Sequence, residues 1–229
     1  MVGFFDSGVG GRCVLDAFRR LCPDEPTVYV ADTAHCPYGN KSPEEIIRLS
    51  KNIAADLIGR GCDVVVVACN TATAAAIDTL RVTWPDIPFV GMEPAVKPAA
   101  LGSKSGVVGV LATRGTFKGR LYRQTSARVS GNVKIIECVA DEFVAFVVRG
   151  ETDGPAVEAA VRSRIEPLIA AGADRIVLGC THFPHLKTVM ERVAGERAEI
   201  VDPSDAVARR ICDVLARVKG KRRGVKGES

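Results

Sequence analysis

The sequence lacks any uninterrupted run of about 18 apolar residues, which is the length that a membrane-spanning helix needs. It also lacks a basic stretch followed by a long apolar segment at its start, so we expect no secretory signal peptide. These two absences predict a cytoplasmic protein without a membrane partner, in a compartment where thiols stay reduced.

No CxxC pair occurs among the eight cysteines. In a reducing compartment these cysteines do not indicate a disulfide framework, and without CxxC spacing they do not indicate structural zinc. We expect most of them to be small buried hydrophobic residues, and we predict no metal. A thiol or metal site built from Cys180, His182 and His185 is an alternative with poor ligand spacing.

Fingerprints for nucleotides and pyridoxal phosphate are missing as well. Gly8, Gly10 and Gly11 do not have GxGxxG spacing, and no P-loop Lys-Ser/Thr pair follows them. No lysine stands in a pyridoxal-binding context. We therefore predict no cofactor, and we interpret the glycines as a tight turn that lets the backbone approach a small anion.

The body of the chain has no excess of charge of one sign. The formal net charge is +4, but the stretch "KGKRRGVKG" at 219–227 supplies five Lys and Arg. Because the remainder is close to neutral, we expect no nucleic-acid binding. The tail is predicted to be a frayed, solvated end, with an electrostatic patch as the alternative.

What the sequence does contain is a regular alternation of strand and helix patterns along its 229 residues. Alternation of this kind predicts parallel sheets with right-handed crossovers. We predict an α/β fold of two pseudo-symmetric lobes, each a mostly parallel sheet flanked by helices, with residues 1–93 plus 206–229 in one lobe and 94–205 in the other. Strands are predicted at 2–5, 27–32, 63–68, 88–93, 106–113, 133–139, 175–180 and 198–203, and helices at 11–21, 42–61, 71–84, 116–128, 155–171, 183–194 and 204–218.

One phrase occurs twice, as "DVVVVACNT" at 63–71 and "DRIVLGCTH" at 174–182, each with a Gly two positions before the Asp. Ligands bind outside the carboxyl ends of the strands in open α/β sheets, so Cys69 and Cys180 are predicted to face one cleft. Both precede a predicted helix, whose N-terminus is expected to lower the thiol pKa. The alternative is that both are core residues that end buried strands.

Two thiols on opposite sides of a bound molecule suit stereoinversion at a carbon that bears hydrogen. One thiolate removes the proton and the opposite thiol returns a proton to the other face. Asp6 and His182 are expected to tune Cys69 and Cys180, although Asp6 also fits a turn-former and His182 a structural residue. Hydroxyl, amide and backbone groups for substrate carboxylates are offered by Ser7, Asn70, Thr71, Thr113, Thr116 and Thr181. Each of these residues alone fits a helix cap better than a ligand contact, but together they exceed what capping needs.

Over nearly the whole chain the sequence resembles the glutamate racemase family, in the stretches "FFDSGVGG", "ADTAHCPYG", "VVVACNTATA", "LATRGT", "VLGCTHFP" and "VDPSDAVARR". The resemblance implies a cofactor-independent interconversion of L- and D-glutamate that supplies D-glutamate for peptidoglycan. It also implies two pseudo-symmetric lobes with the site between them, and a homodimer.

The family's catalytic cysteines fall on Cys69, which acts on the D-enantiomer, and on Cys180, which acts on the L-enantiomer. Its auxiliary acids fall on Asp6 and His182. Its substrate contacts fall on Ser7, Pro37, Tyr38, Gly39, Asn70, Thr71, Thr113, Thr116 and Thr181.

One position departs from the family pattern: "FVAFVVRG" has Val148 where the family usually has a Glu that assists on the Cys180 side. Glu142 and Glu151 lie near in sequence but are not aligned with it. An aspartate or broad-specificity acidic amino-acid racemase would use the same thiol pair. A weakly active regulatory paralogue that contacts another protein is the alternative of a different class, which Val148 favours and the two cysteines oppose.

Overall fold

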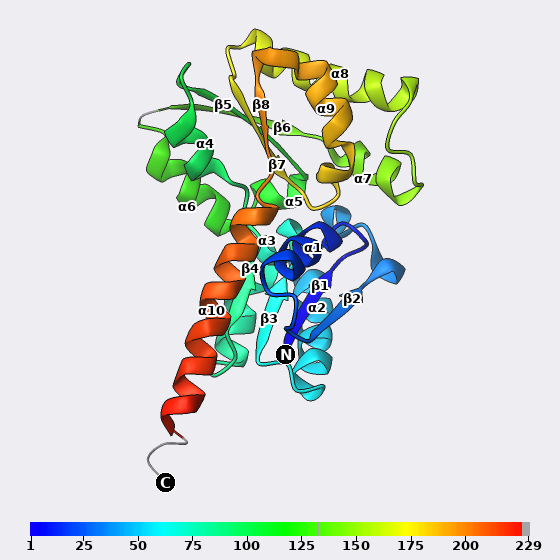
Figure 1. Ribbon diagram of the computed structural model, residues 1–229. Helices are drawn as coiled ribbons and strands as arrows, with labels where there is room; N and C mark the ends of the chain where they lie inside the picture. Colours follow the sequence, from blue (N-terminus) through cyan, green and yellow to red (C-terminus); the bar gives the residue numbers. More distant parts are fainter. Residues whose placement is uncertain (132, 226–229) are drawn as a thin grey trace.

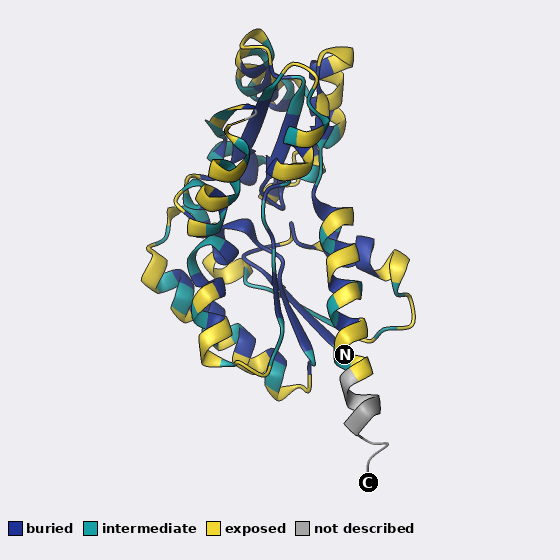
Figure 2. Cartoon of the chain, turned by 90° about the vertical axis from the view of Figure 1, so that its left-hand side faces the viewer, coloured by how far each residue is buried: buried dark blue, intermediate teal, exposed yellow. Residues whose placement is uncertain are grey.

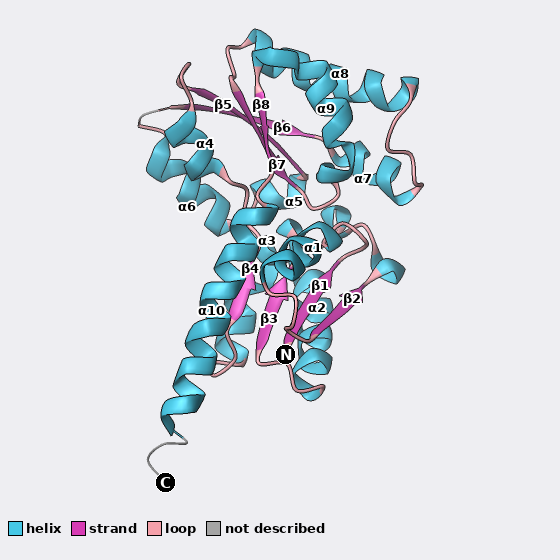
Figure 3. Ribbon diagram, in the orientation of Figure 1, coloured by secondary structure: helices cyan, strands magenta, loops and turns pink. Residues whose placement is uncertain are grey.

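The computed structural model describes residues 1–131 and 133–225, and it places them in two lobes stacked one on the other (Figure 1). Each lobe contains a four-stranded sheet with helices on both faces (Figure 3). The first lobe contains β1 (Val2–Asp6), α1 (Arg12–Leu21), β2 (Thr27–Ala31), η1 (Thr33–His35), η2 (Tyr38–Asn40), α2 (Pro43–Gly59), β3 (Val64–Val67), α3 (Asn70–Thr83) and β4 (Phe89–Gly91).

The second lobe repeats this plan and is followed by one long helix. Its elements are α4 (Val96–Gly102), β5 (Val107–Ala112), α5 (Arg114–Phe117), α6 (Arg120–Val129), β6 (Lys134–Val139), α7 (Asp141–Val148), α8 (Pro155–Ala170), β7 (Arg175–Gly179), η3 (Phe183–Leu186), α9 (Lys187–Ala194), η4 (Gly195–Arg197) and β8 (Glu199–Val201), and the last helix is α10 (Ser204–Val225).

The two sheets have the same topology. Their strand orders are β2-β1-β3-β4 and β6-β5-β7-β8, and every pairing is parallel. The predicted two-lobed α/β fold is therefore confirmed. β3 and β7 hold the same place in their sheets, so the repeated phrase of the sequence marks equivalent strands whose carboxyl ends carry the two cysteines.

The repeated glycines end the helices that lead into these strands. Gly61 and Gly172 have φ of 84° and 93°, a left-handed conformation that favours glycine. After each of them, the next amide reaches back to the helix, from Cys62 N to Leu57 O at 3.1 Å and from Ala173 N to Leu168 O at 3.0 Å. At both places this helix-ending motif turns the chain sharply into the strand that follows.

The strands of both sheets are largely buried, and the exposed residues lie mostly on the outer helices and loops (Figure 2). β3 consists of four valines that are all fully buried, as expected of a parallel strand between two helical layers. Burial of a valine side chain contributes about 1.5 kcal/mol or more. These cores hold the strands rigidly and so fix the positions of the residues that follow them.

The last helix, α10, leaves the second lobe and packs along α1 of the first lobe (Figure 1). Its buried residues Ala208, Ile211 and Leu215 belong to the same core cluster as Val14 and Phe18. The helix was predicted to end at 218 and to be followed by a frayed tail. This prediction is wrong for residues 219–225, because they continue the helix. Residues 226–229 of the predicted tail lie outside the described residues. The lobe boundaries near 93 and 205 stay a prediction.

Three further details differ from the sequence-based expectation. The helices α4 and α7 were not predicted, and the helix predicted at 116–128 is divided into α5 and α6. The division falls at Gly119, where a Cβ atom would lie 2.6 Å from the Cβ of Ala74. This close approach to α3 is a tertiary constraint that no local pattern reveals. No helix in the described part of the chain is long and apolar enough to cross a membrane.

Candidate active site

One cavity lies between the lobes, at the carboxyl ends of β1, β3, β5 and β7, and it has about 410 Å³ of free space including the part open to solvent. All the predicted site residues except Asp6 and Thr116 line it. Its lining is Ser7, Pro37, Tyr38, Gly39, Asn40, Cys69, Asn70, Thr71, Thr113, Asp141, Val144, Cys180, Thr181 and His182.

Cys69 lines the cavity from the first lobe and also begins α3. Its Sγ caps the helix by accepting a hydrogen bond from Ala72 N at 3.4 Å. The thiol also donates to Ser7 Oγ at 3.5 Å, and the residue is only 4% exposed. Because β3 and the start of α3 are both buried, this sulfur has little freedom to move.

Cys180 lines the same cavity from the second lobe and is 8% exposed. His182 Nδ1 lies 3.9 Å from its Sγ, so the predicted neighbourhood of thiol and imidazole is present. The short η3 follows instead of an α-helix. The turn at Gly10 packs tightly here, because a Cβ on Gly10 would lie 2.7 Å from His182 N.

Burial dominates the electrostatics of both thiols. It raises the pKa of Cys69 to about 12, with a further rise from the charge of Asp6, against the hydrogen bonds with Ser7 and Ala72. Burial raises the pKa of Cys180 well above its ordinary value too, and the hydrogen bond from the His182 backbone only partly opposes this. The expectation of lowered pKa values is therefore wrong, because loss of solvation outweighs a helix N-terminus.

Asp6 lies behind the cavity as a fully buried link between the lobes. Its carboxylate accepts hydrogen bonds from Gly8 N and Gly11 N, both at 3.1 Å, which hold the glycine turn. It also accepts one from Thr181 Oγ1 at 3.3 Å, across the lobes. Its partners are thus the turn and the other lobe, and it influences Cys69 through its charge.

Threonine hydroxyls form a second link between the lobes. Thr71 Oγ1 lies 2.9 Å from Thr113 Oγ1, and Thr113 Oγ1 lies 3.0 Å from Thr116 Oγ1. The Thr116 hydroxyl donates onward to Gly179 O at 3.5 Å. Thr71 and Thr113 face the cavity, whereas Thr116 supports them from behind.

Two polar atoms at the cavity are buried without a hydrogen-bond partner among the described residues: Asn70 Oδ1 and His182 Nε2. Burial lowers the pKa of His182, so its imidazole is neutral near pH 7. Unsatisfied buried polar atoms are costly and uncommon in folded proteins. Both atoms belong to residues that line the cavity, and His182 Nε2 lies against the glycine turn, 3.0 Å from where a Cβ on Gly8 would lie.

Sequence reasoning missed three lining residues: Asn40, Asp141 and Val144. Asp141 could have been found, because it follows the carboxyl end of β6 just as the other site residues follow their strands. Its Oδ1 accepts a hydrogen bond from Arg114 N at 3.1 Å.

Val148 does not line this cavity, and it is 57% exposed. The two glutamates near it in sequence are engaged elsewhere: Glu142 pairs with Arg164, and Glu151 pairs with Arg149. Within the described residues, no group of three His, Cys, Asp or Glu is arranged to hold a metal ion, and His185 does not line the cavity.

Comparisons with known proteins agree on one family of racemases. The model of the Asp/Glu/hydantoin racemase family matches residues 12–211. The chain is 48% identical to a glutamate racemase of Roseiflexus sp. (strain RS-1), over 93% of this chain and 79% of that protein. A glutamate racemase of Bacillus anthracis superposes with a TM-score of 0.86 at 29% identity, covering 95% and 82% of the two chains. The Escherichia coli glutamate racemase in complex with L-glutamate and the activator UDP-MurNAc-ala gives 0.85 at 36% identity, covering 94% and 82%.

Proposed function

Since the chain belongs to the Asp/Glu/hydantoin racemase family, we propose that it is a glutamate racemase that uses Cys69 and Cys180 as its two bases. The observation that carries this proposal is the position of the two thiols, which come from equivalent strands of two similar lobes and line one cavity. The product D-glutamate would serve peptidoglycan synthesis. The proposed setting is the cytoplasm, and the proposed assembly is a homodimer.

The proposed reaction is a proton exchange at the α-carbon. The thiolate of Cys69 removes the α-proton of D-glutamate, and the thiol of Cys180 donates a proton to the opposite face; L-glutamate uses the reverse pair. Each turnover leaves the two sulfurs with exchanged protonation states. A bound substrate fills the space between the lobes, so a single base could not reach both faces.

The raised thiol pKa values require that something in the complex stabilises a thiolate. No lysine or arginine lines the cavity among the described residues, and His182 is neutral. The α-ammonium of the substrate itself would bring the positive charge, because an opposite charge within a few ångströms lowers a thiol pKa. Deprotonation would then depend on substrate binding, and the buried thiols would stay protonated and unreactive without it.

The substrate carboxylates need hydrogen-bond donors and not cations in such a cavity. Donors come from the hydroxyls of Ser7, Thr71 and Thr113, from the amide of Asn70, and from His182 if its neutral ring carries the proton on Nε2. Glutamate is favoured over aspartate by the relatives, one of which is described with L-glutamate bound.

The test is racemisation of either glutamate enantiomer without added cofactor, followed by circular dichroism. We expect Cys69→Ala and Cys180→Ala each to abolish racemisation, whereas Cys138→Ala, a half-buried cysteine outside the cavity, keeps the parent rate. Racemisation at the parent rate by either active-site variant would refute the two-base assignment.

A further inference from the structure

A second groove adjoins the catalytic cavity, and the charged residues in its walls are positive. It shares Gly39 and Thr71 with the cavity, and it encloses about 740 Å³ of free space including the part open to solvent. Both lobes contribute to it. We call it the outer groove; its cationic residues are Lys41, Lys118, Arg120 and Arg123.

Small residues of the two lobes meet closely at the wall of the outer groove. A Cβ on Gly115 would lie 2.8 Å from Thr71 Cγ2, and one on Gly119 would lie 2.6 Å from Ala74 Cβ. The cationic side chains line the free space of the groove together with Pro43 and Ile46.

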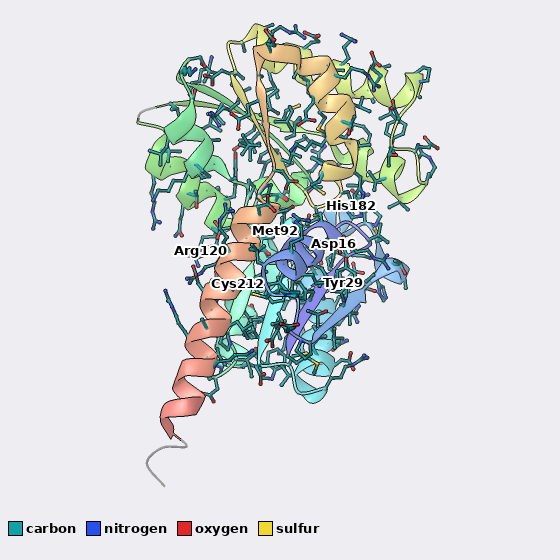
Figure 4. The ribbon with its side chains drawn as sticks, in the orientation of Figure 1. Asp16, Tyr29, Met92, Arg120, His182 and Cys212 are labelled. Carbon is teal, nitrogen blue, oxygen red and sulfur yellow. The ribbon has the colours of Figure 1, made fainter. Side chains whose placement is uncertain are left out.

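Two of the four cations are already paired. Lys41 Nζ lies 2.7 Å from Glu45 Oε1, and Arg120, labelled in Figure 4, reaches Asp78 of α3 at 2.6 Å. Lys118 and Arg123 are exposed and make no ion pair with any described residue. No Asp or Glu lines the groove within the described part of the chain.

The catalytic cavity, in contrast, has a negatively charged residue in its lining and no positively charged one among the described residues. Its only Lys, Arg, Asp or Glu among the described lining residues is Asp141, and Asp6 lies just behind it. A substrate with two carboxylates therefore meets negative charge inside and uncompensated positive charge outside. Coulomb interactions between a dicarboxylate and two cations at a groove persist over about one Debye length, roughly 8 Å at physiological salt.

We propose that the outer groove is an anion-binding site that collects the dicarboxylate substrate at the mouth of the catalytic cavity, with Lys118 and Arg123 as its binding groups. This inference rests on the proposed racemase function. The two cations raise the concentration of the anion at the entrance and take no part in proton transfer. The site therefore acts on substrate capture and not on the chemical step.

The test compares Lys118→Gln/Arg123→Gln with a control of equal charge change, Lys134→Gln/Arg128→Gln, whose residues line neither cavity. We expect the groove variant to have a KM for glutamate about threefold or more above that of the parent, because it loses the attraction of two cations for an anion in water. Its kcat should stay within about twofold of the parent value. Its kcat/KM should also fall less steeply with added salt than that of the parent.

The control should keep the parent KM and the parent salt dependence. Equal KM and equal salt dependence in the groove variant and the control would overturn the inference while the parent enzyme still racemises. A parent protein that does not racemise would instead refute the proposed function.

Discussion

At the scale of single residues, burial controls the chemistry of the cavity. The two thiols have raised pKa values because they lie in the core with Asp6 nearby, and the imidazole of His182 has a lowered pKa for the same reason of burial. Residues of this kind are held in their neutral forms until a charged ligand arrives. Sequence could predict which residues meet here, from their places after strands, but not their protonation, because depth of burial is a tertiary property.

The pH dependence of kcat/KM follows from the raised pKa of Cys69. Since that pKa is about 12, the thiolate fraction of the free protein grows with pH throughout the range below it. We expect kcat/KM to rise steadily from about pH 7 to about pH 9, a range that spans the ordinary thiol pKa of about 8.5. Initial rates in buffers of constant ionic strength measure this. A rise that levels off near pH 8.5 or below would show that the thiol pKa is not raised above its ordinary value.

At the scale of elements, the repeated phrase of the sequence is explained by one unit used twice: a helix ended by glycine, a buried strand and a thiol. All eight strands could be predicted, because parallel strands buried on both faces leave an apolar run between turn residues. The helices α4 and α7 could not, since both are short and their patterns are ambiguous. Contacts between lobes, such as Asp6 with Thr181, depend on how two cores meet, and local patterns carry no information on this.

The glycine turn after β1 gives a prediction about these contacts. We expect Gly10→Ala to lose at least about tenfold in kcat/KM, because its Cβ would meet the backbone of Thr181 and His182 at 2.7 Å, and misplacement of about 1 Å in an active site costs rate of this order or more.

The matched control is Gly59→Ala, at the end of α2, where nothing lies within 4 Å of the added methyl group. This variant should keep its activity and its melting temperature, with any change toward higher stability. Equal activities of the two alanine variants would contradict a tight contact between the turn and the second lobe.

At the scale of the whole molecule, the site exists only because two separately packed lobes face each other. The Asp6–Thr181 bond, the hydroxyl contact of Thr71 with Thr113 and the Arg120–Asp78 pair connect the two lobes. A ligand that contacts both lobes should therefore stabilise the folded molecule as a whole.

Binding can be measured apart from catalysis in the double variant Cys69→Ala/Cys180→Ala. We expect either glutamate enantiomer at about 100 times its Kd to stabilise this protein by about 2.7 kcal/mol, seen as a rise of several degrees in melting temperature. Aspartate at the same concentration should give a smaller rise. A larger rise with aspartate would favour the aspartate racemase alternative.

The deuterium content of the α-carbon in substrate and product during the first turnovers tests the two-thiol account most directly. The protein is exchanged into deuterated water, L-glutamate is added, and the reaction is stopped at low conversion. We predict that the D-glutamate formed carries deuterium at its α-carbon while the remaining L-glutamate carries none, because one sulfur takes the proton and the other delivers a solvent-derived deuteron. D-glutamate that keeps the original protium, or L-glutamate that gains deuterium as fast as product forms, would contradict two opposed bases.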